Sequence, residues 1–269
     1  MIDSLVSLED ALDSRLYGGK AASLARASAS GLRVPPGVVL TVDAVEAVAT
    51  GRTTELCMLE AVVQRFHRLA VRSSSPAEDT RATSLAGQLT SIINVVSFEG
   101  VVAAIRAVWE SARAPRVGAY LERMGLPPSS GTAAILQQLV LCEVAGVMFT
   151  VDPVSGADER VIEASWGLGE AVLGALVTPD RFRLARSGAV LSRTLGSKRY
   201  VMLPMPDGGT VRAPAESSLV AAYCLDNGAL RKLHELAARV EQLYPGPHDV
   251  EWGIARGELY LLQDRPVTA

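Results

Sequence analysis

Apolar and polar positions alternate near the end of the printed sequence. The pattern predicts two short strands joined by a turn at Arg256-Gly257, because β-branched, aromatic and leucine residues flank a glycine there. Successive side chains of a strand point to opposite faces, so Asp249 and Glu251 should share one face of the first strand. On the second strand Gln263 and Arg265 should likewise share a face.

The length of the turn decides whether these two polar pairs meet. A two-residue turn would pair Glu251 with Leu262 and direct Gln263 to the opposite face. A three-residue turn over Ala255-Arg256-Gly257, with the glycine in the left-handed region, would pair Asp249 with Gln263 and bring all four polar side chains together. The residues alone leave both turns open.

The chemistry of the polar set points to a metal and a phosphate. Carboxylate and amide oxygens, here of Asp249, Glu251 and Gln263, suit a hard cation such as Mg²⁺, and the guanidinium of Arg265 suits a phosphate. The same alternation also describes a hairpin with one face in solvent. Both interpretations remain at this point.

A second candidate lies near the start of the chain, where Gly18-Gly19-Lys20 precedes a helix predicted over residues 21–29. Flexible backbone, free N–H groups and one cation at a helix start could hold an anion. The motif is not a Walker A loop, which would need glycine at Ser14 and serine or threonine at Ala21. A plain helix-entry loop is the alternative.

Two further phrases combine strands with polar or glycine residues. In Val71-Arg72-Ser73-Ser74 an apolar strand ends in a cation and hydroxyl groups, a common position for ligand contacts in α/β proteins. Gly87 precedes a strand predicted over residues 89–95, and its missing side chain would let the backbone approach a phosphate. Ordinary turns would use the same residues.

The middle of the sequence predicts a boundary between two lobes. A helix is predicted over residues 98–122, with apolar positions at helical spacing. The Pro- and Ser-rich stretch before Gly131 is a linker candidate, so we expect one lobe over residues 1–130 and a second over 131–269. Strands over 133–140 and 143–150 should form a hairpin in the second lobe, where a buried Gln137 would need a partner or a ligand.

Composition narrows the class of protein. The 269 residues are 49% hydrophobic, enough for a sizeable core, and the net charge of −3 gives no basic surface for nucleic acid or an anionic membrane. Three scattered cysteines, the absence of a leader-like N-terminus and the lack of a membrane-length apolar run predict a soluble cytosolic protein. The three histidines are far apart in sequence, which argues against a catalytic triad or a histidine metal site, although His248 lies next to Asp249.

Taken in order, the phrases resemble the ATP-grasp nucleotide-binding domain of the pyruvate phosphate dikinase family, whose members include phosphoenolpyruvate synthase and rifampin phosphotransferase. The resemblance extends over almost the whole chain. The matching text is Gly18-Gly19-Lys20-Ala21-Ala22-Ser23-Leu24, Val34-Pro35-Pro36-Gly37, Val71-Arg72-Ser73-Ser74 with Ala77-Glu78-Asp79, Ala86-Gly87-Gln88, Gln137-Gln138-Leu139-Val140, Ala145-Gly146-Val147-Met148-Phe149-Thr150-Val151-Asp152-Pro153, Gly167-Leu168-Gly169-Glu170, Thr178-Pro179-Asp180, and Asp249-Val250-Glu251-Trp252 through Gln263-Asp264-Arg265-Pro266.

The resemblance implies a two-lobed α/β (α+β) ATP-grasp fold with ATP and Mg²⁺ between the lobes. By position, Lys20 and Arg72 would hold phosphates, and Gly87 and Ser91 would line the phosphate loop, with Ser91 where the family usually has threonine. Gln137 would lie on the nucleotide wall, with its neighbour Gln138 as an alternative alignment.

The same resemblance assigns the C-terminal polar set. Glu251 and Gln263 would bind Mg²⁺, Asp249 would support them, and Arg265 would contact the transferred phosphoryl group. In the family a swivelling domain follows, whose histidine carries the phosphoryl group in a Thr-Ser-His context. The printed sequence stops at Ala269 and none of its histidines has that context, so we expect the carrier to lie outside this chain.

The expected function is an ATP- and Mg²⁺-dependent phosphotransferase. The acceptor would be a small molecule or a histidine of a separate partner protein. One alternative is an ATP-grasp carboxylate–amine ligase that forms an acyl phosphate, and another is a non-catalytic, ATP-binding regulatory protein. The sequence does not identify the acceptor, the choice between ADP and AMP as product, or the oligomeric state.

Overall fold

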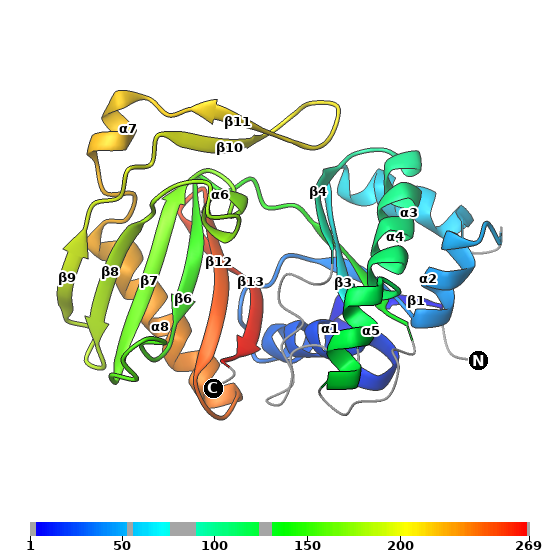
Figure 1. Cartoon of the computed structure of the whole chain (residues 1–269), viewed down its shortest axis with the longest axis horizontal. Helices are drawn as coiled ribbons and strands as arrows, with labels where there is room; N and C mark the ends of the chain where they lie inside the picture. The colour runs from blue at the N-terminus through cyan, green and yellow to red at the C-terminus, as the bar shows by residue number, and fades with distance from the viewer. Residues whose placement is uncertain (1–3, 53–55, 76–89, 124–130, 268–269) are drawn as a thin grey trace.

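Two antiparallel sheets form the frame of the protein, as the computed structural model shows (Figure 1). The structure describes residues 4–52, 56–75, 90–123 and 131–267. The first sheet has the strand order β1-β2-β5-β3-β4, and the second has the order β13-β12-β6-β7-β8-β9. The strands of the first sheet are β1 (Leu5–Ser7), β2 (Gly37–Leu40), β3 (Leu69–Ser74), β4 (Ser91–Val95) and β5 (Ala133–Gln138).

Helices cover both faces of the first sheet, because its central strands are apolar on both sides. Alternate residues such as Leu40 and Leu136 pack against α2 (Val42–Ala49), α3 (Leu56–Phe66) and α4 (Phe98–Ala112). Their neighbours Val39 and Ile135 point to the opposite face, toward α1 (Ser14–Ala29) and the short 3₁₀ turn η1 (Leu8–Asp10).

The long helix predicted over residues 98–122 is two helices in the structure. Helix α4 ends at Ala112, and α5 (Pro115–Arg123) begins at a proline. Proline disfavours helical backbone at the residue before it but is well tolerated at the first position of a helix. The interruption therefore falls at Ala114-Pro115.

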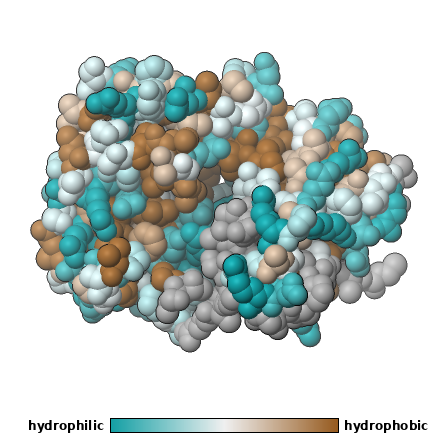
Figure 2. Space-filling view, in the orientation of Figure 1, coloured by the Kyte–Doolittle hydropathy of each residue, from teal (hydrophilic) through white to brown (hydrophobic). Residues whose placement is uncertain are grey.

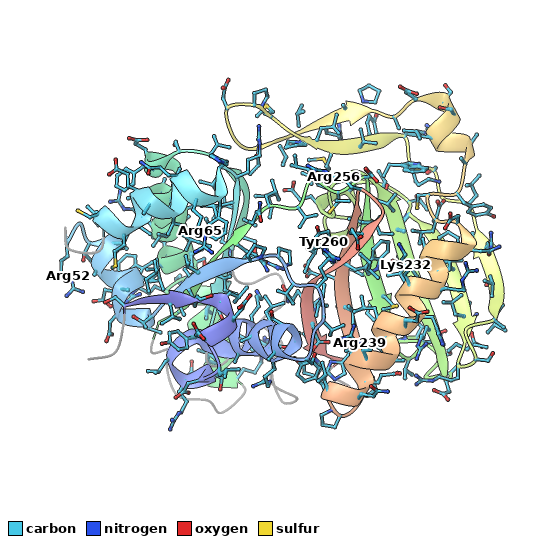
Figure 3. All side chains as sticks on the ribbon, turned by 180° about the vertical axis from the view of Figure 1, so that it is seen from behind. Arg52, Arg65, Lys232, Arg239, Arg256 and Tyr260 are labelled. Carbon is cyan, nitrogen blue, oxygen red and sulfur yellow. The ribbon has the colours of Figure 1, made fainter. Side chains whose placement is uncertain are left out.

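The second sheet carries the polar hairpin at one edge. Its strands are β6 (Val144–Phe149), β7 (Glu159–Trp166), β8 (Asp180–Ala185), β9 (Val190–Thr194), β12 (His248–Ala255) and β13 (Glu258–Pro266). Helix α8 (Asn227–Leu243) lies across one face of this sheet, as the view from behind shows (Figure 3). Two labelled side chains of α8 tie it to its neighbours: Lys232 donates to the carbonyl of Gly257, and Arg239 donates to that of Ser30.

Helix α1 joins the two lobes through one hydrophobic core. Leu24 of α1 belongs to the same buried cluster as Ile135 of the first sheet and Trp252 of the second. Tyr244, just after α8, donates its hydroxyl to the carbonyl of Ser23 at 2.7 Å. The predicted α+β class and the two-lobed ATP-grasp arrangement are confirmed by these sheets and the helices on them.

The predicted hairpin between strands 133–140 and 143–150 is wrong. Strand β5 lies between β2 and β3 of the first sheet, whereas β6 lies between β12 and β7 of the second. Apolar strands that are buried on both faces carry no pattern that selects a partner, which is why sequence proximity suggested a hairpin. We therefore propose the lobe boundary in the segment between β5 and β6 instead of at residue 130.

A third, two-stranded sheet extends from the second lobe. It consists of β10 (Tyr200–Pro204) and β11 (Thr210–Pro214), followed by the short helix α7 (Ser217–Ala221). Another short helix, α6 (Glu170–Leu173), packs against β10, β6 and β7. No helix within the described ranges is long and apolar enough to cross a membrane.

Candidate nucleotide site

The four polar side chains of the C-terminal hairpin lie on one face of the second sheet. Glu251 pairs directly with Gln263, and Asp249 pairs directly with Arg265. Directly opposed residues of antiparallel strands point to the same side of the sheet. The structure therefore brings together the two carboxylates, the amide and the guanidinium that the sequence singled out.

Of the two turns that the sequence left open, the structure has the two-residue turn, combined with an irregularity that neither alternative included. Ala255 pairs with Glu258, so the turn has two residues, Arg256 and Gly257, with φ angles of 50° and 73°. Positive φ at both central residues is the geometry of a type I′ turn. On its own, this turn would direct Gln263 to the wrong face.

A β-bulge restores the alignment. The register shifts between Glu251 and Trp252, where Leu262 is the extra residue of β13. One added residue moves every later side chain of the strand to the opposite face. Gln263 and Arg265 thereby return to the face of Glu251 and Asp249.

Arg72 reaches this face from the other lobe. It lies in β3 of the first sheet, and its side chain is almost fully buried. Its Nη2 atom donates to Glu251 Oε2 at 2.9 Å and to Gln263 Oε1 at 2.5 Å. Its Nη1 atom donates to the carbonyl of Leu262 at 2.6 Å. One guanidinium thus binds both side chains proposed as metal ligands and the bulged residue between the strands.

Asp249 and Arg265 form a second ion pair beside the first. Nε and Nη2 of Arg265 lie 2.8 and 2.5 Å from Asp249 Oδ2. The other oxygen, Oδ1, is buried and has no hydrogen-bond partner within the described part of the chain. Burial raises the pKa of the Asp249 carboxyl, and Arg265 opposes that rise.

The Gly-Gly-Lys motif forms a kink in α1 that rests on the end of β3. Gly18 has a φ of 81°, and a Cβ atom at this position would lie 2.1 Å from the carbonyl oxygen of Ser74. The Ser74 hydroxyl accepts from Ala21 N at 3.0 Å, which fixes the start of the helix beyond the kink. Lys20 is buried, and its Nζ donates to the carbonyl of Ser73 at 3.2 Å. Lys20 therefore binds the residue next to Arg72.

The remaining candidates from the first lobe differ in how they are placed. Ser91 opens β4 opposite Arg72, and its side chain is exposed on the same face. Gln137 is buried on β5, two positions from the residue that opposes Arg72, and its Nε2 donates to the carbonyl of Pro35 at 3.0 Å. A backbone carbonyl is thus one partner of this buried amide. Gly87 lies outside the described residues.

The oxygen atoms of this face suit a hard cation that also binds phosphate and water ligands. Glu251 offers a carboxylate, Gln263 an amide carbonyl, and Asp249 the unpartnered Oδ1. Among the described residues no group of three or more His, Cys, Asp or Glu side chains could hold a metal. Mg²⁺ in nucleotide sites is typically held by one or two carboxylates together with substrate phosphates and water. Two carboxylates and one amide oxygen are therefore enough protein ligands for such a magnesium ion.

One feature of the site has no signal in the sequence, and one residue that the sequence suggested lies elsewhere. The carbonyl of Leu262 serves as an acceptor for Arg72 because the bulge removes it from regular strand pairing, and no residue type marks such a bulge. His248, which drew attention beside Asp249, faces the other side of the sheet, where its Nδ1 lies 2.8 Å from Asp264 Oδ1. Its position next to Asp249 in the sequence is therefore not a contact in the site.

Comparison with known proteins agrees with the family resemblance. Residues 53–269 match the family described as pyruvate phosphate dikinase, AMP/ATP-binding domain. A probable phosphoenolpyruvate synthase of Methanothermobacter thermautotrophicus is 32% identical over 304 aligned positions, which cover 95% of this chain and 44% of that protein. A rifampicin phosphotransferase of Streptomyces sviceus is 34% identical over 201 positions, covering 74% of this chain and 23% of that protein.

The chain thus spans less than half of the length of these two relatives. Among solved structures, a D-alanine–D-alanine ligase of Bacillus anthracis aligns with a TM-score of 0.46 at 10% identity, covering 95% of this chain and 59% of the ligase. The fold assignment above rests on the sheets and helices of the protein itself.

Proposed function

The chain belongs to the pyruvate phosphate dikinase AMP/ATP-binding domain family, and from that premise we propose that it is a phosphotransferase that binds ATP and Mg²⁺ between its lobes. The observation that carries the proposal is the meeting of Arg72 with Glu251 and Gln263. A cation from one lobe and oxygen ligands from the other form a single polar cluster, which is what a nucleotide's phosphates and metal require.

Phosphoryl transfer asks a protein mainly to position the groups and to neutralise charge. Lys20 of α1 and Arg72 of β3 supply two buried cations, and Arg265 supplies a third on the second sheet. In this proposal Lys20 and Arg72 hold the phosphates, and Arg265 contacts the group in transfer. Gln137 and Ser91 lie on the same face of the first sheet as Arg72 and would line the nucleotide; Gly87 belongs to the same proposal by its position in the sequence.

Glu251 and Gln263 would hold Mg²⁺ with support from Asp249, and the metal would supply further charge neutralisation at the phosphates. In the present structure the Arg72 guanidinium binds oxygen atoms of both ligands. The flexible arginine side chain can turn toward a phosphate, and its planar guanidinium matches the geometry of phosphate oxygens. We infer that Arg72 exchanges these carboxylate and amide partners for phosphate oxygens when nucleotide and metal bind.

The phosphoryl acceptor comes from outside the cluster in this proposal. All three histidines lie in the described part of the chain, and none belongs to the cluster: His248 pairs with Asp264 on the opposite face, and His234 contacts Arg160. The third, His67, follows α3 in the first lobe. In this proposal a small molecule or a histidine outside the printed residues receives the phosphoryl group.

Phosphorus-31 NMR of ATP and Mg²⁺ with the protein and candidate acceptors would test the proposal. We expect a phosphorylated acceptor, and the remaining nucleotide signals identify ADP or AMP as product. Arg265→Ala should lower the rate by about 10³–10⁵-fold, the range for arginines that stabilise phosphoryl transfer. Consumption of ATP only when a carboxylate and an amine are both present would instead identify a ligase, and full activity of Arg265→Ala would contradict the assigned role.

A further inference from the structure

The β10–β11 hairpin belongs to the second lobe but ends on the first. Figure 1 shows it passing over the space between the two large sheets, with its connecting loop beside β4, and the view from behind in Figure 3 agrees. In the middle of β10 it is held by its own lobe, where Leu168 N donates to the carbonyl of Met202 at 3.1 Å. Its loop, residues 205–209, is held by the other lobe.

Asn94 of β4 is the centre of that second attachment. Its side chain is fully buried, and Nδ2 donates to the carbonyls of Met205 at 2.8 Å and of Gly209 at 2.6 Å. The backbone carbonyl of Asn94 accepts from Gly209 N at 2.9 Å. Both hydrogens of the amide and the main chain of one residue are thus used to hold the hairpin loop.

Arg68 completes the attachment and connects it to the segment between the lobes. Its Nη1 donates to Asn94 Oδ1 at 2.5 Å and to the carbonyl of Met205 at 3.0 Å. Its own backbone carbonyl accepts from Leu139 N at 3.0 Å, where the chain leaves the first sheet for the second. The orientation of the Asn94 amide follows from these partners, since its oxygen faces a donor and its nitrogen faces two acceptors.

The backbone of Asn94 is adapted to this position. Its φ of 62° lies in the left-handed region, which asparagine tolerates better than most residues. The neighbouring Ile93 packs with Met202, Leu168 and Ala171 of the second lobe. Figure 2 shows apolar side chains gathered on both lobes beside their boundary, below the hairpin. The hairpin loop is therefore attached by hydrogen bonds beside a hydrophobic contact between the two lobes.

We propose that the β10–β11 hairpin is a clasp that sets the separation of the two lobes, with Asn94 and Arg68 as its positioning residues in the first lobe. The proposal rests on the proposed function in one respect, that the nucleotide lies between those lobes. The clasp would slow nucleotide release and hold Arg72 within reach of Glu251 and Gln263. Neither Asn94 nor Arg68 contacts those three side chains in the described structure.

Two variants that break the attachment and one control variant distinguish a loss of the clasp from a general effect of mutating the hairpin region. Asn94→Asp keeps the size of the side chain and suits the left-handed backbone, but it places an oxygen against the carbonyls of Met205 and Gly209. Arg68→Ala removes the hydrogen bonds from Arg68 to Asn94 and Met205 and leaves Asn94 itself unchanged. Arg212→Ala is the matched control, because Arg212 belongs to the same hairpin and stacks on Tyr200 instead of bonding to the first lobe.

The first measurement is the distance between the lobes without nucleotide. Nitroxide labels on Cys57 in α3 and on Ser187→Cys in the β8–β9 turn report it by double electron–electron resonance; both positions are exposed. Burial raises the pKa of the Cys142 thiol to about 12 and raises that of Cys224 as well, so neither competes strongly for the label near neutral pH. We expect one narrow distance for the parent and for Arg212→Ala, and a longer, broader distribution for Asn94→Asp and Arg68→Ala.

The second measurement is the dissociation rate of a fluorescent ATP analogue. We expect release to be about tenfold faster in Asn94→Asp and Arg68→Ala than in Arg212→Ala, the change that corresponds to one or two lost hydrogen bonds. Distances and release rates equal to those of Arg212→Ala in both clasp variants would overturn the proposal. If the parent binds no nucleotide, the proposed function fails while the distance measurement still decides the clasp. Should Asn94→Asp fail to fold, as judged by circular dichroism, the distance and the release rate of Arg68→Ala decide the proposal.

Discussion

Arg72 and Gln263 come from different sheets, and their side chains meet with 2.5 Å between Nη2 and Oε1. The contact requires an arginine within β3 and a bulge in β13 that directs Gln263 to the face of Glu251. Through it and the bond to Glu251, a cation of the first lobe contacts two side-chain oxygens of the second. A single guanidinium thus links the position of one lobe relative to the other with the side chains that we propose as metal ligands.

The first prediction concerns the geometry of that guanidinium. Arg72→Lys keeps the positive charge, but an ammonium group cannot reproduce the planar fork that reaches Leu262, Glu251 and Gln263 together. We expect ATP turnover to fall by about 10³-fold or more, toward the range for phosphate-clamp arginines. Steady-state kinetics measures this, with Arg113→Lys as a control on the surface of the first lobe, where Arg113 pairs with Glu46. Turnover within a few-fold of the parent in Arg72→Lys would show that charge alone suffices.

The second prediction tests the register of the C-terminal hairpin. Deleting Leu262 removes the bulge residue but leaves Gln263 opposite Glu251, because the two-residue turn then pairs them directly. Inserting a second residue after Leu262 moves Gln263 away from Glu251, to a position opposite Val250 if the bulge is kept and opposite Asp249 if the strand becomes regular. We therefore expect the insertion to abolish Mg²⁺-dependent nucleotide binding. The deletion should weaken binding by only about 10- to 100-fold, which corresponds to one charged hydrogen bond.

Isothermal titration calorimetry with Mg²⁺ and a non-hydrolysable ATP analogue distinguishes the two length variants. Thermal unfolding provides the control, since both should retain the second sheet. Equal loss of binding in the deletion and the insertion, with both proteins folded, would contradict the assignment of the polar face.

The hairpin also shows how far the sequence alone could go. Alternation was enough to place Asp249 with Glu251 and Gln263 with Arg265, because the period of a strand is fixed. It could not decide whether the pairs meet, since that depends on a bulge whose extra residue is an ordinary leucine. The turn length stayed open for the same reason, because a two-residue turn plus a bulge and a three-residue turn give the same final face.

The sequence also could not predict which distant strands pair with each other. The residues of β5 read as an apolar strand, and nothing in Ala133–Gln138 indicates that its neighbours are β2 and β3 instead of β6. The clasp depends on contacts more than 100 positions apart, between Asn94 and the loop at Met205 and Gly209. A single buried asparagine in a strand predicts the need for partners, but it does not identify them.

The third prediction follows from the raised pKa of the Asp249 carboxyl. Because burial raises this pKa above the ordinary value of 3.8, the folded protein holds more protons than the unfolded chain in the interval between the two values. The stability that this group contributes therefore falls as the pH rises through that interval. Asp249→Asn removes the titration, so its free energy of unfolding relative to the parent should be higher at pH 7 than at pH 4.

Urea denaturation at both pH values measures this difference, and Asp13 provides a control of opposite sign. The Asp13 carboxyl is exposed and its pKa is lowered, chiefly by hydrogen bonds from Arg15. A lowered pKa contributes stability above the ordinary value and loses it in acid. Asp13→Asn should therefore be less stable relative to the parent at pH 7 than at pH 3, which lies below the ordinary value of 3.8. The same sign for both variants would contradict the assigned burial of Asp249.

The fourth prediction concerns a buried ion pair away from the proposed site. Lys198 and Asp180 are both fully inaccessible to solvent and lie 2.5 Å apart, and the same carboxylate accepts from the backbone N–H groups of Gly196 and Cys224. Thr178-Pro179-Asp180 is one of the family phrases, and in this structure its carboxylate joins the start of β8 to the segments that lead into β10 and α8. Its role is therefore in the packing of the second lobe.

Lys198→Met removes one charge and leaves the other buried without its counter-ion. Breaking a buried pair in this way typically costs about 3–5 kcal/mol, far more than the loss of an exposed pair. We expect a loss of that size in the free energy of unfolding from urea titration, and a much smaller one for Arg15→Met, which breaks the exposed pair with Asp13. Lys198→Arg keeps the charge but inserts a larger group at a fully buried position, so we expect it to recover only part of the loss. Losses of equal size for Lys198→Met and Arg15→Met would mean that Asp180 is satisfied by the backbone N–H groups alone.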